Sequence, residues 1–214
     1  MDTGSLIDSL AADLQPAAGR TPRRLVTLAL LAAMPLVLLL VITPIGLRPD
    51  LAVAVTGSMF WMKLAYTAAI GAIGVAAAAV LFRPETTPPR WLWLLAVPVV
   101  VFVAGAIREA LSMPAPDFMG VWFGPSWTVC SALISGLSLP VAAALVWAAR
   151  RLAPTRLRAT GAAIGLASGG VSAALYSLHC PEAGASFVLT WYTLGILIPA
   201  ALGALLGPRL LRWT

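Results

Sequence analysis

The residues with the most varied chemistry in this sequence lie close together near its C-terminal end, in the stretch YSLHCPEAG at positions 176–184. This stretch contains His179, which is the only histidine, Cys180, which is one of two cysteines, and Glu182. The other cysteine, Cys130, lies fifty positions earlier. Because thiolate and imidazole groups suit soft or borderline metals such as Cu(I) and Zn, the residues Cys130, Cys180 and His179 form a candidate metal site, with Glu182 as a further ligand.

The two cysteines have other interpretations as well. Two thiols can close a disulfide when their Cα atoms lie within ~7 Å of each other, and a membrane cysteine often packs simply as a small hydrophobic residue. The link that faces Cys180 contains Met113, Asp117 and Met119, which would add sulfur and oxygen ligands to a metal site. The residues by themselves leave metal binding, disulfide formation and packing open.

These residues belong to a very apolar chain. Of its 214 residues, 60% are hydrophobic and 10% are charged, whereas an ordinary soluble domain has about 25% charged residues. The mean hydropathy is +0.94, and a helix that crosses a bilayer needs about 20 mainly apolar residues. Six runs satisfy this condition, at 25–47, 64–82, 91–107, 130–149, 159–178 and 187–206. We therefore predict an all-α fold, with a cytoplasmic N-terminal segment at 1–24 and a six-helix transmembrane domain at 25–214.

The positive charges predict how the helices are oriented. Lysine and arginine are enriched in the cytoplasmic links of membrane proteins. Eleven arginines lie in the N-terminal segment, the second and fourth links and the C-terminal tail, whereas the opposite side has Arg48, Lys63 and Arg108. We predict a multi-pass protein of the bacterial inner membrane with cytoplasmic N- and C-termini and outer links at about 48–62, 108–129 and 179–186. Both cysteines then lie at the periplasmic face.

Several classes of function are disfavoured. The six runs lack ionisable side chains through their central portions, where ion-coupled transporters place them. The chain has no phosphate-binding loop, nucleophile elbow, HExxH or CxxC motif, so we expect it not to be an enzyme. The arginines lie at the ends of the runs, which argues against direct nucleic-acid binding. Gly161, Gly165 and Gly169 have a small-xxx-small spacing, which favours close helix packing.

The N-terminal segment has features of a docking helix. Leu6, Ile7, Leu10 and Leu14 fall on one side of a helix at 100° per residue, and Asp8 and Asp13 add negative charge. A short apolar stripe of this kind can bind in a groove of a partner protein. The acidic residues argue against an anionic lipid surface, which favours lysine and arginine.

Together these features resemble the NrsF family of integral-membrane anti-sigma factors over essentially the full length. The resemblance rests on LIDSLAADL and RTPRR before the first run, LRPDL after it, SWTVC and LHCPE around the two cysteines, and LGPRLLRW at the end. It implies a protein that holds an extracytoplasmic-function sigma factor inactive and releases it under metal or oxidative stress. It also implies that Cys130 and Cys180 are the sensory pair, and that Leu6, Ile7, Leu10 and Leu14, with the short cytoplasmic links, hold the sigma factor.

Two alternative functions remain on the residues alone. A membrane thiol oxidoreductase would use Cys130 and Cys180, but such enzymes relay electrons between cysteine pairs, and the chain has a single pair. A transporter of a metal or small molecule is the other alternative. We expect no firmly bound cofactor beyond a transient soft metal ion at the periplasmic face. The expected partners are the sigma factor and membrane lipid, and the oligomeric state is left open.

Overall fold

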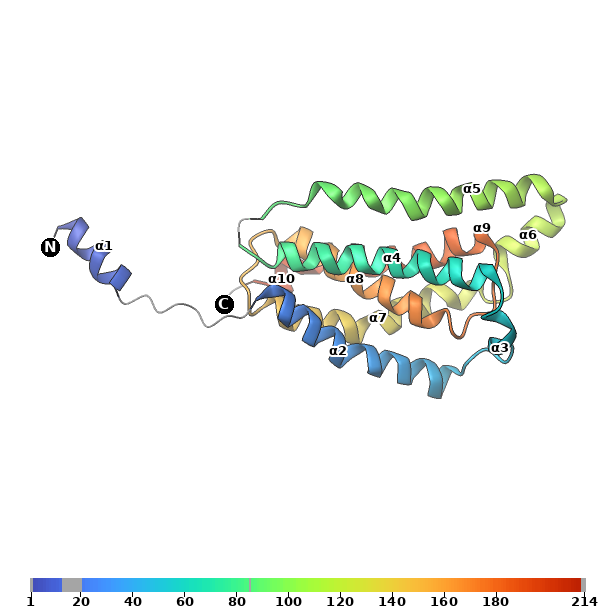
Figure 1. The fold of residues 1–214 in the computed structure, drawn as a ribbon, viewed down its shortest axis with the longest axis horizontal. Coiled ribbons are helices and arrows are strands. Elements are labelled where there is room, and N and C mark those ends of the chain that lie inside the picture. Colours follow the sequence, from blue (N-terminus) through green and yellow to red (C-terminus); the bar gives the residue numbers. More distant parts are fainter. Residues whose placement is uncertain (1, 13–20, 85, 213–214) are drawn as a thin grey trace.

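The protein is described by a computed structural model that covers residues 2–12, 21–84 and 86–212 (Figure 1). Within these residues it contains helices and no strand, which confirms the predicted all-α class. The elements are α1 (Thr3–Ala12), α2 (Pro22–Leu40), the π-helical turn η1 (Val41–Ile45), α3 (Leu51–Ala54), α4 (Ser58–Leu81), the 3-10 helix η2 (Arg90–Leu95), α5 (Ala96–Ser112), α6 (Ala115–Phe123), α7 (Trp127–Ala149), α8 (Leu157–Tyr176), α9 (Ala185–Phe187), the π-helical turn η3 (Val188–Tyr192) and α10 (Thr193–Leu210).

Six helical stretches are long and apolar enough to cross a membrane, as the sequence predicted. They are Pro22–Ile45, Ser58–Leu81, Arg90–Ser112, Ala115–Ala149, Leu157–Tyr176 and Ala185–Leu210. Large hydrophobic side chains on their outer surfaces are exposed, among them Leu31, Leu111 and Leu205. Such a surface is stable in lipid rather than in water, so the fold is consistent with a membrane protein.

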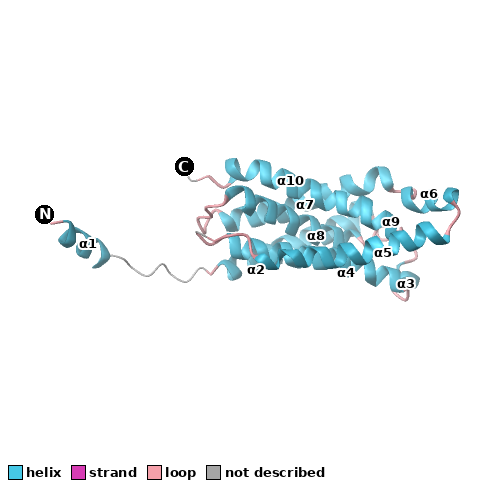
Figure 2. Cartoon of the chain, turned by 90° about the horizontal axis from the view of Figure 1, so that it is seen from above, coloured by secondary structure: helices cyan, strands magenta, loops and turns pink. Residues whose placement is uncertain are grey.

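Successive spans run in opposite directions, so the connections gather at the two ends of the bundle (Figures 1 and 2). The beginning of α2, the end of α10 and the connections at 82–84, 86–89 and 150–156 lie at one end. The connections at 46–57, 113–126 and 177–184 lie at the other, and both cysteines belong to that end. We call it the cysteine end.

Helix α8 forms the centre of the bundle and packs on α4 on one side and α10 on the other. Its glycines allow the backbones to approach closely. A Cβ atom added at Gly165 would overlap the carbonyl oxygen of Pro199 in α10, and one added at Gly161 would overlap that of Gly203. On the α4 side, a Cβ at Gly170 would overlap Gly71. The close packing predicted from the small-xxx-small spacing is therefore confirmed.

The helix boundaries differ from the predicted runs at the cysteine end. The predicted outer link at 48–62 is shorter, because α4 begins at Ser58 and incorporates Lys63 into its second turn. The predicted link at 108–129 is largely helical, since α5 continues to Ser112 and α6 follows it. Hydropathy underestimated these spans because charged and polar residues occupy helix ends that are still within the bundle.

Candidate functional site

The fold brings Cys130 and Cys180 together at the cysteine end. Cys130 lies in the first turn of α7, where its N–H donates to the carbonyl oxygen of Ser126 at 2.9 Å. Cys180 follows the end of α8, and its N–H donates to Tyr176 at 3.1 Å. Both side chains are fully buried and are free thiols. The two thiols are close enough for each to affect the ionisation of the other, so the two groups can react as a pair.

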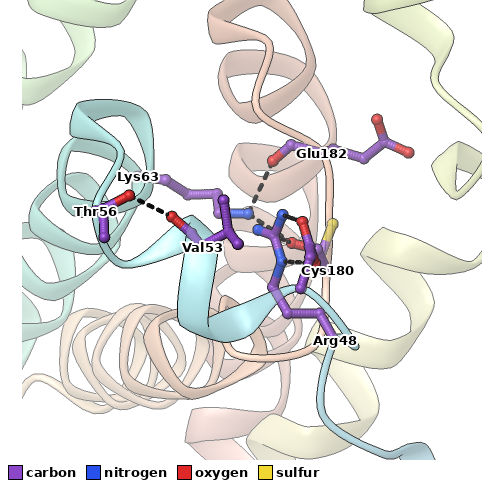
Figure 3. Close-up of polar contacts among 7 residues, drawn as sticks. Arg48, Val53, Thr56, Lys63, Cys180 and Glu182 are labelled. Carbon is purple, nitrogen blue, oxygen red and sulfur yellow. Dashed lines mark hydrogen bonds and ion pairs between the residues drawn. The ribbon is translucent and has the colours of Figure 1, made fainter.

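Lys63 forms hydrogen bonds to the segment that contains Cys180 (Figure 3). Its side chain is 1% exposed, and its Nζ donates to the carbonyl oxygens of Cys180 and Glu182, both at 2.8 Å. Nζ also lies 5.4 Å from the centre of the Tyr192 ring. In a low-dielectric interior, a positive charge interacts strongly with neighbouring groups. Lys63 therefore gives the cysteine pair a cationic environment.

Arg48 adds a second cation beside the same segment (Figure 3). Its guanidinium forms a two-pronged ion pair with Asp50, with both N–O distances at 2.7 Å, and also donates to the Cys180 carbonyl oxygen at 3.5 Å. The Asp50 carboxylate raises the pKa of Arg48, and the guanidinium lowers that of Asp50. The connection at 46–50 is thereby held against the cysteine segment.

His179 and Glu182 hold neighbouring connections in place. The His179 Nδ1 atom lies 2.7 Å from the Gly46 carbonyl oxygen, so the ring joins the connections that precede α3 and follow α8. The Glu182 carboxylate accepts hydrogen bonds from the N–H and hydroxyl of Ser126, at 3.4 and 3.1 Å. The same Ser126 hydroxyl lies 3.8 Å from the Cys180 sulfur. Ser126 therefore connects the Glu182 carboxylate to the Cys180 thiol.

The structure thus brings Cys130 and Cys180 close together, while His179 bonds to Gly46 and Glu182 bonds to Ser126. In the described part of the chain, no three His, Cys, Asp or Glu side chains are grouped so that they could hold a metal ion. The two thiols are therefore the soft ligands that this end of the bundle offers to a metal ion. Metal ligation by His179 and Glu182 stays a prediction.

The electrostatics favour the thiolate form of Cys180. The neighbouring Cys130 thiol lowers the pKa of Cys180 below its usual value. Burial opposes this effect, and the nearby Lys63 ammonium lowers the pKa further. Thiolates rather than thiols are the nucleophiles and metal ligands of proteins. The arrangement can therefore support disulfide formation, reaction with an electrophile, or capture of a soft metal.

Sequence reasoning missed four residues that surround the thiols. Lys63 and Arg48 were treated only as topology signals, although Lys63 is the only lysine in the chain and stands between the apolar triplets FWM and LAY. An ionisable residue in that context is a functional candidate. Tyr176 and Tyr192 had no signal in the sequence. Their hydroxyl groups are buried without a hydrogen-bond partner among the described residues and lie next to the cysteine sulfurs.

The predicted docking segment is described in part. α1 is helical from Thr3 to Ala12, as expected. Ile7 is 60% exposed and Asp8 is also exposed, so both are accessible to a partner. Leu6 and Leu10 belong to this helix, whereas Asp13 and Leu14 lie outside the described residues. Binding of a sigma factor by these side chains remains a prediction.

Comparison with known proteins shows the family. Residues 10–213 match the model of the family NrsF, described as negative regulator of sigma F. The chain is 42% identical to the Anti-sigma-F factor NrsF of Caulobacter vibrioides over all of both chains. It is 40% identical to the Probable anti-sigma-F factor NrsF of Azospira oryzae over 82% of both chains. No solved structure matches the chain. This 214-residue six-span protein belongs to the NrsF family.

Proposed function

We propose that this protein is an inner-membrane anti-sigma factor that holds an extracytoplasmic-function sigma factor inactive at the cytoplasmic face. The observation that carries the proposal is full-length similarity to a relative named an anti-sigma-F factor. Six spans long enough to cross a bilayer support a membrane location, and the arginine-rich end of the bundle supports cytoplasmic termini. A regulator of this kind binds its partner and needs no catalytic activity.

The cysteine pair is the proposed stress sensor at the periplasmic face. Its two thiols lie close together, and the pair lies beside the buried ammonium of Lys63. Two thiolates suit a soft metal, whereas a nearby fixed cation opposes an incoming metal cation and favours a thiolate that reacts with an oxidant. In the oxidative route, the two thiols lose two electrons and two protons to a thiol oxidant, and a sulfur–sulfur bond forms.

A change at the cysteine pair would be transmitted along α7 and α8. Each of these helices is attached to one of the cysteines, and the two are joined at the opposite end by the connection at 150–156. That end is further tied to α10, since Arg150 donates a hydrogen bond to the Leu210 carbonyl oxygen at 2.5 Å. A bond or metal that draws the cysteines together would shift the cytoplasmic surface that holds the sigma factor.

A pull-down from the native host tests the proposal. The full chain, solubilised in detergent under reducing conditions, is expected to retain one sigma factor, whereas a chain without residues 1–20 retains much less. The matched control is a chain in which residues 1–20 are present but shuffled in order. If the full chain retains no sigma factor, and deletion of its gene leaves sigma-dependent transcription unchanged, the anti-sigma role is wrong.

A further inference from the structure

A long groove lies between α2, α4 and α8, and neither cysteine belongs to its lining. Its volume is about 810 Å³, and its lining is mainly apolar. Leu30 and Met34 of α2 line one side, and Ala72 and Ala76 of α4 line the other. Two arginines, Arg23 and Arg83, also belong to the lining. The groove therefore combines an apolar channel with positive charge.

The packing of the helices explains the groove. α2 packs mainly on α7, whereas α4 packs mainly on α8, so α2 and α4 make little direct contact. Ala68, Ala72 and Ala76 repeat every four residues and therefore lie on one face of α4. These three side chains are exposed, and methyl groups are too small to fill the space that α2 leaves open. The result is a hollow that faces outward from the bundle.

The groove extends over more than one leaflet of a bilayer, since its lining reaches Leu175 in the last turn of α8. Arg23 and Met34 are eleven residues apart on α2, which is about 16 Å at 1.5 Å per residue. The hydrocarbon core of a bilayer is about 30 Å thick. Arg23 is in the first turn of α2 and Arg83 lies two residues after the end of α4, so both arginines lie at the proposed cytoplasmic end. The apolar part of the groove then extends past the middle of the membrane toward the cysteine end.

We propose that this groove binds one anionic phospholipid of the cytoplasmic leaflet. An acyl chain lies along Ala72 and Ala76, and the phosphate is held between Arg23 and Arg83. Guanidinium groups bind phosphate oxygens through paired, charge-assisted hydrogen bonds, and basic pockets between spanning helices recognise anionic headgroups. Both arginines are exposed, and neither forms an ion pair with another described residue.

The depth of the groove argues against a protein segment as its occupant. Most of the lining lies at the level of the hydrocarbon core, where an irregular peptide would leave its N–H and C=O groups without hydrogen bonds. An acyl chain has no such groups. A neutral phospholipid would fill the apolar part equally well, but its headgroup has no net negative charge to match the two arginines.

Native mass spectrometry of the full chain tests this proposal. The protein in detergent is titrated with phosphatidylglycerol and with phosphatidylcholine that carries the same acyl chains. Phosphatidylglycerol is expected to bind at least about tenfold more tightly, because each interfacial arginine contributes severalfold. The double substitution Arg23→Gln and Arg83→Gln should remove this preference. Arg90→Gln, which removes an exposed arginine near the same end of the bundle, should leave it unchanged.

A second variant tests the apolar part of the groove. Ala72→Leu should weaken the binding of both lipids by filling the hollow, whereas Ala104→Leu, at an exposed position of α5, should weaken neither. Equal binding of the two lipids by the unaltered chain, or a preference that survives the double arginine substitution, would overturn the proposal.

A photo-crosslinker at Ala76 should capture lipid. Capture of α1 or of the sigma factor would show a protein occupant and would also overturn the proposal. If Ala72→Leu does not fold, the arginine variants still decide the question, because their side chains are exposed.

Discussion

The Nζ atom of Lys63 lies 2.8 Å from the carbonyl oxygen of Cys180, although the two residues are 117 positions apart. Lys63 comes from α4 and Cys180 from the connection that follows α8, and these two helices pack against each other in the centre of the bundle. The contact places the only lysine of the chain beside a thiol that is paired with Cys130. The chemistry of the cysteine end therefore depends on a residue outside both cysteine segments.

The first prediction concerns the cysteines themselves. Cys130→Ser and Cys180→Ser should each leave the sigma factor bound but abolish its release by metal or oxidant, because one sulfur can neither close a disulfide nor provide a two-sulfur metal site. A sigma-dependent reporter measures induction in cells. Ser131→Ala, which changes the residue next to Cys130 without touching a thiol, serves as the control. Normal induction in both cysteine variants would show that the cysteines only pack.

The second prediction concerns Lys63 and pH. The pKa of Cys180 is lowered, so its thiolate is present at every pH above this pKa. The thiolate is lost only when the pH falls below the pKa. Methylthiolation of Cys180 should therefore be nearly independent of pH between 7 and 9. In Lys63→Met the pKa should rise toward its usual value, and once it exceeds 7 the rate at pH 7 should fall about tenfold for each further unit.

The rate is measured by mass spectrometry of the peptide that contains Cys180. Arg108→Met, which removes an exposed cation from α5 in the same way, should have the pH profile of the unaltered protein. Identical profiles for Lys63→Met and the unaltered protein would mean that the ammonium does not activate the thiol.

The third prediction concerns the docking helix. Replacing Leu10 and Leu14 with Asp should release the sigma factor, because a charge on the apolar stripe cannot be buried in a partner groove without a large desolvation cost. The amount of protein in the membrane should stay the same, and both quantities can be followed by immunoblot. Ala12→Asp falls on the opposite side of the helix and should keep the sigma factor bound. Retention by the double variant would place the contact in the cytoplasmic links instead.

The fourth prediction concerns the packing of α8. Gly165→Ala should destabilise the bundle by about 1–3 kcal/mol, as overpacking commonly does, since its Cβ would overlap the Pro199 carbonyl oxygen. Gly136→Ala is the control, because a Cβ there would have no neighbour within 4 Å. Thermal unfolding in detergent should show a lower Tm for the first variant only. Equal Tm values would mean that α8 and α10 can separate without cost.

The fifth prediction concerns orientation. Reporter fusions after Arg90 and Arg158 should be active in the cytoplasm, and a fusion after Glu182 should be active in the periplasm, because the arginine-rich end remains inside. Alkaline phosphatase and green fluorescent protein give opposite signals in the two compartments. The reverse pattern would place the cysteine pair in the cytoplasm and contradict periplasmic sensing.

The amino-acid sequence by itself determined the helical class, the six spans, the close packing along Gly161 and Gly165, and the family. Each of these depends on local information: the length of an apolar run, the spacing of small residues, or short motifs such as LHCPE. Local patterns are sufficient because a helix satisfies its own backbone in lipid, whatever its neighbours are. The ends of the helices were less well predicted, since Lys63 and Glu109 lie within α4 and α5 despite their charge.

Only the tertiary structure decided which side chains surround the thiols. The sequence suggested Cys130, His179 and Glu182 as neighbours of Cys180, but the structure adds Lys63 and Tyr192, which come from other helices. These contacts depend on the rotation of α4 and η3 about their axes and on their positions around α8. The positions around α8 depend on how its glycine faces fit against its two neighbours. The apolar runs have similar compositions and lipid solvates all of them alike, so the sequence of a run does not show which helix lies next to it.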